Sequence, residues 1–377
     1  MKKITLVTQF FPPDYAATGQ LLDRLTNQLS SSKIKFRIIC GMPYYAYKKT
    51  NVTRFEINKN RLIIRTRLSA LFNKKIFGRI INSLLFVMNI IYNLIFIYPK
   101  SDLIIFTTEP PFSPFISILT FFIKKTKYIL IIYDLYPNIL FENNLISKNN
   151  ILIRIWSFFN KYVYLNAEKI ILLSSPMAKK FVKEFPFTKK KISIIPSWSN
   201  VKKIKPLSKT KNWFVKQHKL NDKFVILYSG NQGRCHDFQT ILDTALLLEN
   251  YPKFVFLFIG NGYKNNLIRE FKISHNLKNI KLLDYQDFDN LPYSLTSADL
   301  ALVSINDRSA NLVAPSKLYG HLAAGSPIGI ISPANSYLEE LIDSNNLGRS
   351  FRNGESNKLK DWIIQIYKDE ELKEAYS

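Results

Sequence analysis

Short apolar runs that recur between helix-length segments constrain the fold of this chain more than any other feature. Their almost continuous hydrophobicity suits strands that are buried on both faces of a sheet. Their alternation with helical segments predicts βαβ units and parallel sheets, and hence an α/β fold. The expected strands span 4–10, 36–40, 103–108, 128–134, 170–174, 192–197, 224–230, 254–260, 280–285, 300–305 and 328–332.

The alternation breaks once, at a basic stretch that is poor in strand signals and that we expect to be a linker, 201–222. On either side we expect a doubly wound, Rossmann-like domain, over 1–200 and 223–356, followed by a C-terminal helix over 357–377. The chain of 377 residues is long enough for two or three domains. In folds of this kind ligands collect at the carboxyl ends of the strands.

The positive charge of the chain is concentrated in its first half. Of the net charge of +25, residues 1–200 carry +21 (30 Lys and Arg against 9 Asp and Glu) and residues 201–377 carry +4 (23 against 19). A nucleic-acid-binding protein is one interpretation, but no nucleic-acid module is recognised. The basic residues are interspersed with apolar sequence, so an anionic membrane surface is the better partner for the first domain.

The segment 76–98 is the most apolar part of the chain and is long enough to cross a bilayer. Arg79, Asn82, Asn89 and Asn93 fall along one face of a helix and leave a broad apolar face elsewhere. Three interpretations remain: a core helix of the first domain, a helix at the membrane interface, and a span. Basic neighbours would attract anionic headgroups or form an ordinary solvated face: Arg61, Arg65, Arg67, Lys74, Lys75 and Arg79.

The amino terminus and the cysteines bear on the compartment. The initial apolar run is only about seven residues long and meets Pro12 and Pro13, so a first strand is expected rather than a signal peptide. The two cysteines, Cys40 and Cys235, lie far apart and cannot build a disulfide framework. A reducing compartment follows, and the cytoplasm is the expected location.

The loop after the first strand, FFPPDYAATGQ, has Gly19 as its only glycine. It therefore lacks the G-x-G-x-x-G fingerprint, which counts against a nucleotide-dependent epimerase or dehydrogenase. Gly19 opens a predicted helix. It could let the backbone approach a phosphate or sugar closely, or it could be a plain turn glycine.

In the second domain, the strand FVILYSG runs into NQGRCHDF. Gly230 and Gly233 allow close approach of a ligand, and Arg234 could offer a cationic fork to a phosphate or be a surface cation. His236 could contact a sugar or phosphate, or could cap or pack. The loop in FLFIGNGYK places two glycines, Gly260 and Gly262, where a flat base could lie against the backbone, with turn glycines as the alternative.

Two further features of the second domain concern residues after strand ends. Tyr285 follows a strand and could pack on a base or be buried in the core. In LVAPSKLYGHLAAGSPIGIIS, Ser316 should start a helix and Gly325 should end it. Lys317 in the first turn opposes the helix dipole, which a bound polyanion would explain; otherwise it is an exposed lysine.

The chain resembles the family 4 glycosyltransferases of GT-B architecture, particularly the branch that builds bacterial surface polysaccharides of the O-antigen, capsule and colanic-acid type. The resemblance runs almost end to end and implies two Rossmann-like domains with an interdomain cleft. The motifs that carry it, in the expected order, are QFFPPDYAATGQ, YDLYPNIL, YSGNQGRCHDFQTIL, FLFIGNGYK, LPYSLTSADLALVSI and VAPSKLYGHLAAGSPI.

The resemblance implies roles for individual residues. Gly19 would approach the donor phosphates from the first domain, and Arg234 and Lys317 would bind the diphosphate. Asp134 would face the cleft as an acceptor contact, with a helix cap as the alternative. The remaining residues expected around the donor are Gly230, Gly233, His236, Gly260, Gly262, Tyr285, Ser316, Tyr319 and Gly320.

The implied reaction is retaining transfer of a sugar from a UDP- or GDP-sugar to a polyprenyl-diphosphate-linked glycan, at the inner face of the cytoplasmic membrane. No cofactor is expected, and no metal, because the sequence shows no convincing cluster of Asp or His ligands.

Two features depart from the family pattern. Many relatives carry a pair of glutamates in this region, whereas the matching positions of this chain are Leu312 and Gly320. Relatives also continue with a helix that returns to the first domain, of which 357–377 is expected to supply part unless the chain is truncated.

Overall fold

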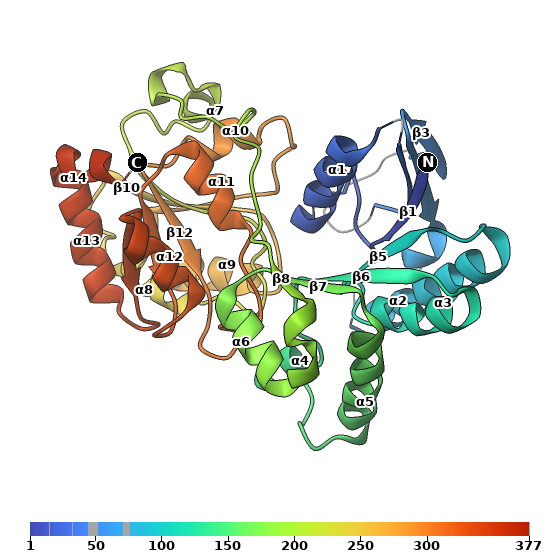
Figure 1. Cartoon of the computed structure of the whole chain (residues 1–377). Helices are drawn as coiled ribbons and strands as arrows, with labels where there is room; N and C mark the ends of the chain where they lie inside the picture. Colours follow the sequence, from blue (N-terminus) through green and yellow to red (C-terminus); the bar gives the residue numbers. More distant parts are fainter. Residues whose placement is uncertain (15, 32, 44–51, 71–75, 377) are drawn as a thin grey trace. The chain divides into compact units, whose positions relative to one another are not determined.

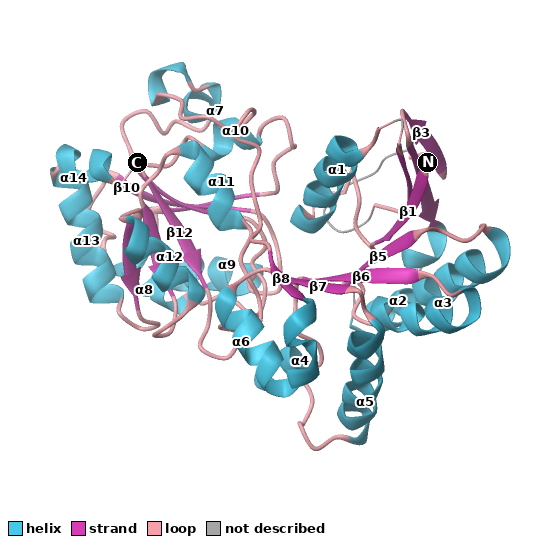
Figure 2. Cartoon of the chain, viewed as in Figure 1, coloured by secondary structure: helices cyan, strands magenta, loops and turns pink. Residues whose placement is uncertain are grey.

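The computed structural model describes the whole chain except residues 15, 32, 44–51, 71–75 and 377 (Figure 1). The chain forms two compact units, one of Met1–Pro196 with Leu312–Ala314 and the other of Ser197–Asn311 with Pro315–Ser377. Each unit has one sheet with helices around it (Figure 2). The α/β architecture with two Rossmann-like units is therefore confirmed.

The sheet of the first unit has the strand order β3-β4-β2-β1-β5-β6-β7-β8. All neighbouring strands are parallel except β3 and β4, which form an antiparallel edge. Every strand expected here is present. The bounds are β1 Lys2–Val7, β2 Ile34–Gly41, β3 Phe55–Asn58, β4 Arg61–Thr66, β5 Leu103–Thr107, β6 Lys127–Ile132, β7 Lys169–Leu172 and β8 Ile192–Ile194.

Two strands, β3 and β4, were not expected because charged residues interrupt their apolar pattern. Arg61 and Arg65 are nevertheless buried, because each pairs with a carboxylate: Arg61 with Asp23 at 2.6 Å and Arg65 with Glu56 at 2.8 Å. Burying a charge is tolerable only when it is paired in this way.

These ion pairs correct the basic border expected beside 76–98. Arg61 and Arg65 are paired inside the first unit and do not face lipid, whereas Arg67 is exposed. Lys74 and Lys75 lie outside the described residues, as does the side chain of Arg79.

The helices of the first unit cover its sheet. Their bounds are α1 Ala17–Leu29, η1 Arg67–Ala70, α2 Ile76–Tyr92, η2 Asn93–Ile97, η3 Ser113–Phe115, α3 Ile116–Lys124, α4 Asn138–Glu142, α5 Ile151–Asn166, α6 Ser175–Glu184 and η4 Pro186–Lys191.

The apolar segment 76–98 forms α2 and the π-helical turn η2. Ile80–Ile97 is long and apolar enough to cross a membrane, by length and composition only. However, the strands on either side of it, β4 and β5, belong to one sheet, and Phe86, Ile90 and Leu94 are buried. The segment is therefore a crossover helix packed on its own unit, and not a span surrounded by lipid.

The second unit has a parallel sheet of order β11-β10-β9-β12-β13-β14. Its five predicted strands are present, and β14 is additional because GRSF has no apolar run. The bounds are β9 Phe224–Ser229, β10 Phe254–Ile259, β11 Ile280–Leu283, β12 Leu300–Ser304, β13 Ile328–Ile331, β14 Gly348–Phe351, η5 Lys209–Lys211, α7 Trp213–Gln217, α8 Gln239–Leu247, α9 Asn265–Ser274, α10 Leu291–Leu295, α11 Lys317–Ala324, α12 Tyr337–Asn345, α13 Ser356–Lys368 and α14 Glu370–Ala375.

The stretch 201–222 is not the linker that we expected. It contains η5 and α7, and Phe214, Val215 and Leu220 are buried in a core cluster of the second unit. The stretch contains many lysines, so its composition suggests a solvated linker even though its apolar residues pack into the unit.

The C-terminal segment 357–377 also packs within the second unit. Leu359, Trp362 and Ile366 of α13 are buried in the same core cluster as β9 and β10 residues. The described residues of α13 and α14 belong to the second unit, so the helix expected to return to the first domain is not found among them.

Candidate functional site

Two glycines bring the loops after β9 and β10 into direct contact. Gly230 and Gly260 have φ of +130° and +126°, a region that L side chains rarely adopt. A Cβ on Gly260 would lie 2.2 Å from the Gly230 carbonyl oxygen, so no larger residue fits. The same Cβ position is 3.4 Å from Cε1 of Tyr285, whose half-buried ring therefore lies against this backbone.

Two more glycines complete this edge. A Cβ on Gly262 would lie 2.6 Å from Oδ1 of Asn231, and one on Gly233 would lie 3.0 Å from Nδ2 of the same residue. The backbone amide of Gln232 donates to the Asn261 carbonyl at 3.0 Å. The four predicted glycines thus form one compact, glycine-lined edge at the carboxyl ends of β9 and β10.

Lys317 extends from the first turn of α11 to this edge. Its Nζ contacts the Tyr228 hydroxyl, the Asn231 carbonyl oxygen at 3.2 Å and Nε2 of His236 at 3.4 Å. Its Nζ also lies 4.0 Å from the centroid of the Tyr228 ring, at cation–π distance. Burial holds the pKa of Lys317 well below its usual range. None of these contacts of Lys317 is with a carboxylate.

The imidazole of His236 lies beside the ammonium of Lys317. The imidazole is buried, and its Nδ1 lies 2.6 Å from the carbonyl oxygen of Ser304. A carbonyl can only accept, so Nδ1 carries the proton and the lone pair of Nε2 faces Lys317. Burial, followed by the charge of Lys317, holds the pKa of His236 well below its usual range. Of the alternatives for His236, the structure shows the packing role. A contact between His236 and a ligand stays a prediction.

Arg234 lies in the same loop. Its guanidinium Cζ is 3.2 Å from the centroid of the Tyr263 ring. Asn306, just beyond β12, fixes the loop backbone: its side-chain amide donates to the Arg234 carbonyl at 2.9 Å and its backbone amide to the Cys235 carbonyl at 2.8 Å. The Arg234 side chain is therefore carried on a rigid loop.

Lys264 is a third cation at this edge, and sequence reasoning missed it. Its Nζ donates to the His236 carbonyl at 2.6 Å. Burial lowers the pKa of Lys264, and the nearby Asp237 carboxylate opposes that shift. Lys264 comes two residues after Gly262 in FLFIGNGYK, so a rule that scans strand ends for cations as well as glycines could have found it.

The remaining residues predicted on α11 have packing roles in the structure. Ser316 precedes the helix, and Gly325 ends it in a left-handed conformation, as expected. The Tyr319 hydroxyl lies 2.5 Å from the Tyr337 hydroxyl. A Cβ on Gly320 would lie 3.1 Å from Cδ1 of Leu295, so this glycine lets α11 pack closely on α10. Their contacts with a donor stay predictions.

The other two predicted residues, Gly19 and Asp134, belong to the first unit. Gly19 is buried, and a Cβ there would lie 2.9 Å from the Phe10 carbonyl carbon, so the glycine serves close packing of α1. Asp134 follows β6 and pairs with Val313 in an isolated antiparallel bridge. This bridge fixes the backbone of Asp134 to the stretch Leu312–Ala314.

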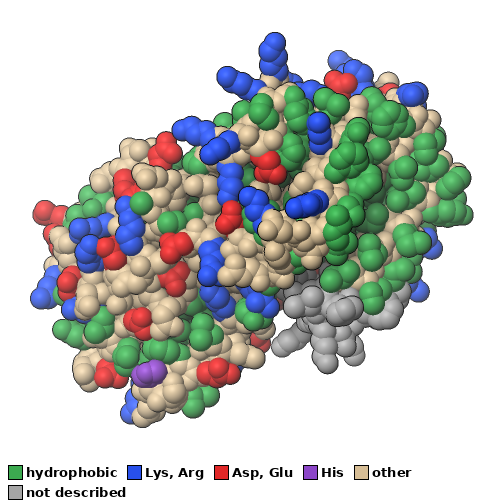
Figure 3. Space-filling model, turned by 90° about the horizontal axis from the view of Figure 1, so that it is seen from below, with side chains coloured by type: hydrophobic (Ala, Val, Ile, Leu, Met, Phe, Trp, Pro, Cys, Tyr) green, Lys and Arg blue, Asp and Glu red, His purple; other side chains and the backbone are tan. Residues whose placement is uncertain are grey.

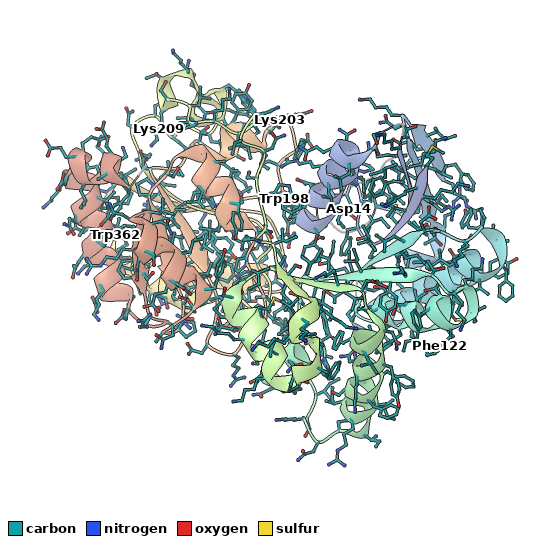
Figure 4. The ribbon with its side chains drawn as sticks, in the orientation of Figure 1. Asp14, Phe122, Trp198, Lys203, Lys209 and Trp362 are labelled. Atoms are coloured by element: carbon teal, nitrogen blue, oxygen red, sulfur yellow. The ribbon has the colours of Figure 1, made fainter. Side chains whose placement is uncertain are left out.

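Asp134 has a neighbour that the sequence reasoning missed. Glu109 follows β5, and its Oε2 accepts a 2.6 Å hydrogen bond from Oγ1 of Thr18. Burial, together with the charges of Asp134 and Asp14, raises the pKa of Glu109 to about 8, although the hydrogen bond from Thr18 opposes the shift. Burial also raises the pKa of Asp134 to about 6. These three acids, hereafter the carboxylate cluster, follow β1, β5 and β6, which is the signal that could have revealed them; Figure 4 labels Asp14.

Within the part of the chain that the structure describes, no three His, Cys, Asp or Glu side chains are grouped so that they could hold a metal ion. Metal independence remains a prediction.

The paired Rossmann-like units form the GT-B fold. WaaG, a glycosyltransferase involved in lipopolysaccharide biosynthesis, superimposes with a TM-score of 0.71 at 11% identity, over 99% of this chain and 92% of that one. HepE from Anabaena, in complex with UDP and glucose, gives a TM-score of 0.70 at 12% identity, over 100% and 92%. At these identities the likeness shows the fold alone.

Sequence comparisons agree with this class. Residues 209–377 match the family model described as Glycosyl transferases group 1, a region that contains Arg234, Lys264 and Lys317. The probable glycosyltransferase WbjE of Pseudomonas aeruginosa is 21% identical over 356 residues, which cover 92% of this chain and 85% of WbjE. Together these similarities support a glycosyltransferase with the GT-B fold.

Proposed function

We propose that this chain is a family 4, retaining glycosyltransferase that takes its sugar from a nucleotide-diphosphate sugar. The observation that carries the proposal is the gathering of Arg234, Lys264 and Lys317 at one glycine-lined edge, with a neutral histidine behind Lys317. Cations placed in advance and partly withdrawn from water stabilise a leaving diphosphate more strongly than cations in bulk water do.

The chemistry needs no further group on the donor side. As the bond to the sugar breaks, negative charge grows on the diphosphate, and Arg234 and Lys317 meet that charge. The leaving phosphate can itself accept the proton of the acceptor hydroxyl, so a front-face, retaining reaction without a metal is consistent with these residues.

The other predicted residues are assigned around this centre. Gly260, Gly262 and Tyr285 would surround the base, and Gly19 would approach the phosphates. Asp134 would contact the acceptor. The remaining donor-side assignments are Gly230, Gly233, His236, Ser316, Tyr319 and Gly320.

We further propose a UDP- or GDP-sugar as donor and a polyprenyl-diphosphate-linked glycan of a surface polysaccharide as acceptor. The HepE complex with UDP and glucose supports the donor class, and the role of WaaG in lipopolysaccharide biosynthesis supports the pathway class. The net charge of +21 on residues 1–200 supports a peripheral location on the anionic inner face of the cytoplasmic membrane.

Substitution of the two principal cations tests the diphosphate assignment. We expect Arg234→Ala and Lys317→Ala each to lower kcat/KM by about 100-fold or more, in line with the loss of one charge-stabilising donor. Lys278→Ala is the matched control, because Lys278 is exposed and precedes β11 at the opposite, amino end of the sheet. Near-normal turnover in both cation variants, with unchanged melting temperatures, would refute the assignment.

The lowered pKa of Lys317 gives a second prediction. A bound diphosphate favours the ammonium, so the pKa of Lys317 should be higher in the complex than in the free protein. UDP binding should then take up protons and weaken as pH rises through the free pKa. Calorimetry in buffers of different ionisation enthalpy measures this uptake. A screen of UDP- and GDP-sugars for thermal stabilisation would identify the nucleotide to use.

A further inference from the structure

Helix α2 of the first unit, with η2, buries two polar side chains beside its buried apolar ones and presents further apolar side chains outward. Asn82 and Asn93 are 1% and 9% exposed, whereas Met88 and Phe96 are 65% and 72% exposed. The buried amide of Asn93 is satisfied locally, since its Nδ2 donates to the Asn89 carbonyl at 2.7 Å. A helix at a water-exposed surface normally has the opposite polarity.

Helix α3 shows the same pattern. Ser117 and Thr120 are fully buried, and the Thr120 hydroxyl donates to the Ser117 carbonyl at 3.1 Å. Phe122 and Ile123 are instead 53% and 59% exposed. Figure 4 labels Phe122 at the edge of the first unit.

Helix α5 is the third example. Asn160 is 3% exposed, and its Nδ2 donates to the Tyr136 carbonyl at 2.9 Å. Leu152 and Phe158 on the same helix are 62% and 56% exposed. Three helices of one unit therefore each bury polar side chains while exposing large apolar ones, which chance placement of single apolar residues does not explain.

The three helices adjoin one another, so their outward side chains form one surface. Lys124 at the end of α3 donates from Nζ to the Tyr98 carbonyl after η2 at 2.8 Å. Phe115 before α3 and Phe159 on α5 have ring centroids 5.9 Å apart. Figure 3 shows hydrophobic side chains gathered on the right of that view, the side on which α2, α3 and α5 lie in Figure 1.

We propose that this surface, the exposed apolar side chains of α2, η2, α3 and α5, is inserted into the hydrocarbon of a lipid bilayer. This inference rests on the proposed peripheral location. It adds hydrophobic insertion to charge attraction as a force that holds the protein at the membrane. Polar side chains beside hydrocarbon must find their partners inside the protein, as Asn93 and Asn160 do. Apolar side chains that would be costly in water gain from insertion.

Charge at the margin also fits a lipid surface. Lys125 lies at the end of α3, and Arg154 and Lys161 lie on α5, all exposed. Cations beside an apolar face match anionic headgroups. A second copy of this chain is the poorer partner, because it would bring another +21 of residues 1–200 against the first.

Vesicle flotation with the full chain tests the proposal. We expect binding to phosphatidylcholine vesicles, and stronger binding when phosphatidylglycerol is included. Binding should persist at about 1 M salt, where screening over about 3 Å removes most surface attraction. Binding that needs phosphatidylglycerol and disappears at high salt would overturn insertion while leaving the peripheral location intact. No binding under any condition would overturn both.

Substitutions on the surface provide the matched comparison. The triple variant Phe96→Ser, Phe122→Ser and Phe158→Ser should lose at least tenfold in vesicle affinity and keep its melting temperature. The control variant Ile57→Ser and Ile273→Ser changes side chains that are 80% and 78% exposed elsewhere, and should bind as wild type. If the triple variant binds vesicles as well as wild type does, the proposal is overturned. It is also overturned if the wild-type protein binds no vesicles but forms a dimer that the triple substitution disrupts.

Tryptophan fluorescence gives an independent readout. Trp156 on α5 is the one tryptophan among residues 1–196, and its ring lies 4.5 Å from that of Phe112. Brominated lipids should quench it on binding, and Trp156→Phe should remove most of that quenching. Donor-binding assays of the triple variant separate the two proposals, since UDP-sugar binding should be unchanged even if membrane insertion is lost.

Discussion

Helices α2 and α13, one from each unit, differ in the kind of side chain that they expose. Helix α13 buries Leu359, Trp362 and Ile366, and its Lys358 is exposed. Helix α2 buries Asn82 with Phe86, and it exposes Met88. Both helices bury apolar side chains, so a buried apolar stripe does not reveal what the outer face meets. The outward side chains do, and they distinguish a helix that faces water from one that faces lipid.

The sharpest test of this difference replaces one aromatic residue in α13 and one in η2, which continues α2. Trp362→Ala should destabilise the second unit by about 3–5 kcal/mol, because a fully buried side chain leaves a cavity. Figure 4 shows Trp362 within that unit. Phe96→Ser should change stability in water by no more than about 0.5 kcal/mol, because Phe96 is exposed. Urea unfolding measures both, and a large loss in Phe96→Ser would remove the contrast.

A smaller effect is expected from the inward polar residues of the first unit. Asn160→Ala should cost about 1–3 kcal/mol, because the part-buried Tyr136 carbonyl loses the Asn160 donor. Asn166→Ala on the same helix is the control. Its amide bonds the Tyr162 carbonyl at a solvent-exposed site, so the loss should be about 1 kcal/mol or less. Equal effects would show that the inward asparagine is not specially placed.

The sequence predicted the architecture well because buried parallel strands are continuous apolar runs. Three strands were missed because charged residues break those runs: β3 contains Glu56, β4 contains Arg61 and Arg65, and β14 contains Arg349. Only tertiary ion pairs make the buried Arg61 and Arg65 tolerable. The orientation of α2 could not be predicted either. The spacing of Asn82 and Asn93 showed that they share a face, but not which face meets the sheet.

The site was predictable where local chemistry conflicted with local structure. Lys317 was singled out because it opposes the dipole of its own helix, and the structure places it beside His236 and the Gly230 loop. Lys264 and Glu109 have no such local conflict. Their partners, the His236 carbonyl and Thr18, are 28 and 91 residues away, so only the folded chain reveals them.

The units also differ in the carboxylates that follow their strand ends. Burial raises the pKa of Glu109 from 4.5 to about 8. The folded protein therefore binds more protons than the unfolded chain between these values, and stability falls as pH rises through that window. Glu109→Gln mimics the protonated acid, so its stability relative to wild type should rise from pH 4.5 to about 8.

Glu355 of the second unit provides the opposite case. The backbone amide of Arg352 and the ammonium of Lys358 hold the pKa of Glu355 below its usual value. Its contribution to stability is present above the usual pKa and is lost as pH falls through the lowered one, so Glu355→Gln should slightly destabilise the protein at neutral pH. Thermal melts across pH should therefore show slopes of opposite sign for the two variants. If stability relative to wild type changes with pH in the same direction for both variants, Glu109 is ionised in the folded protein. The carboxylate cluster would then differ little from a solvated acidic surface.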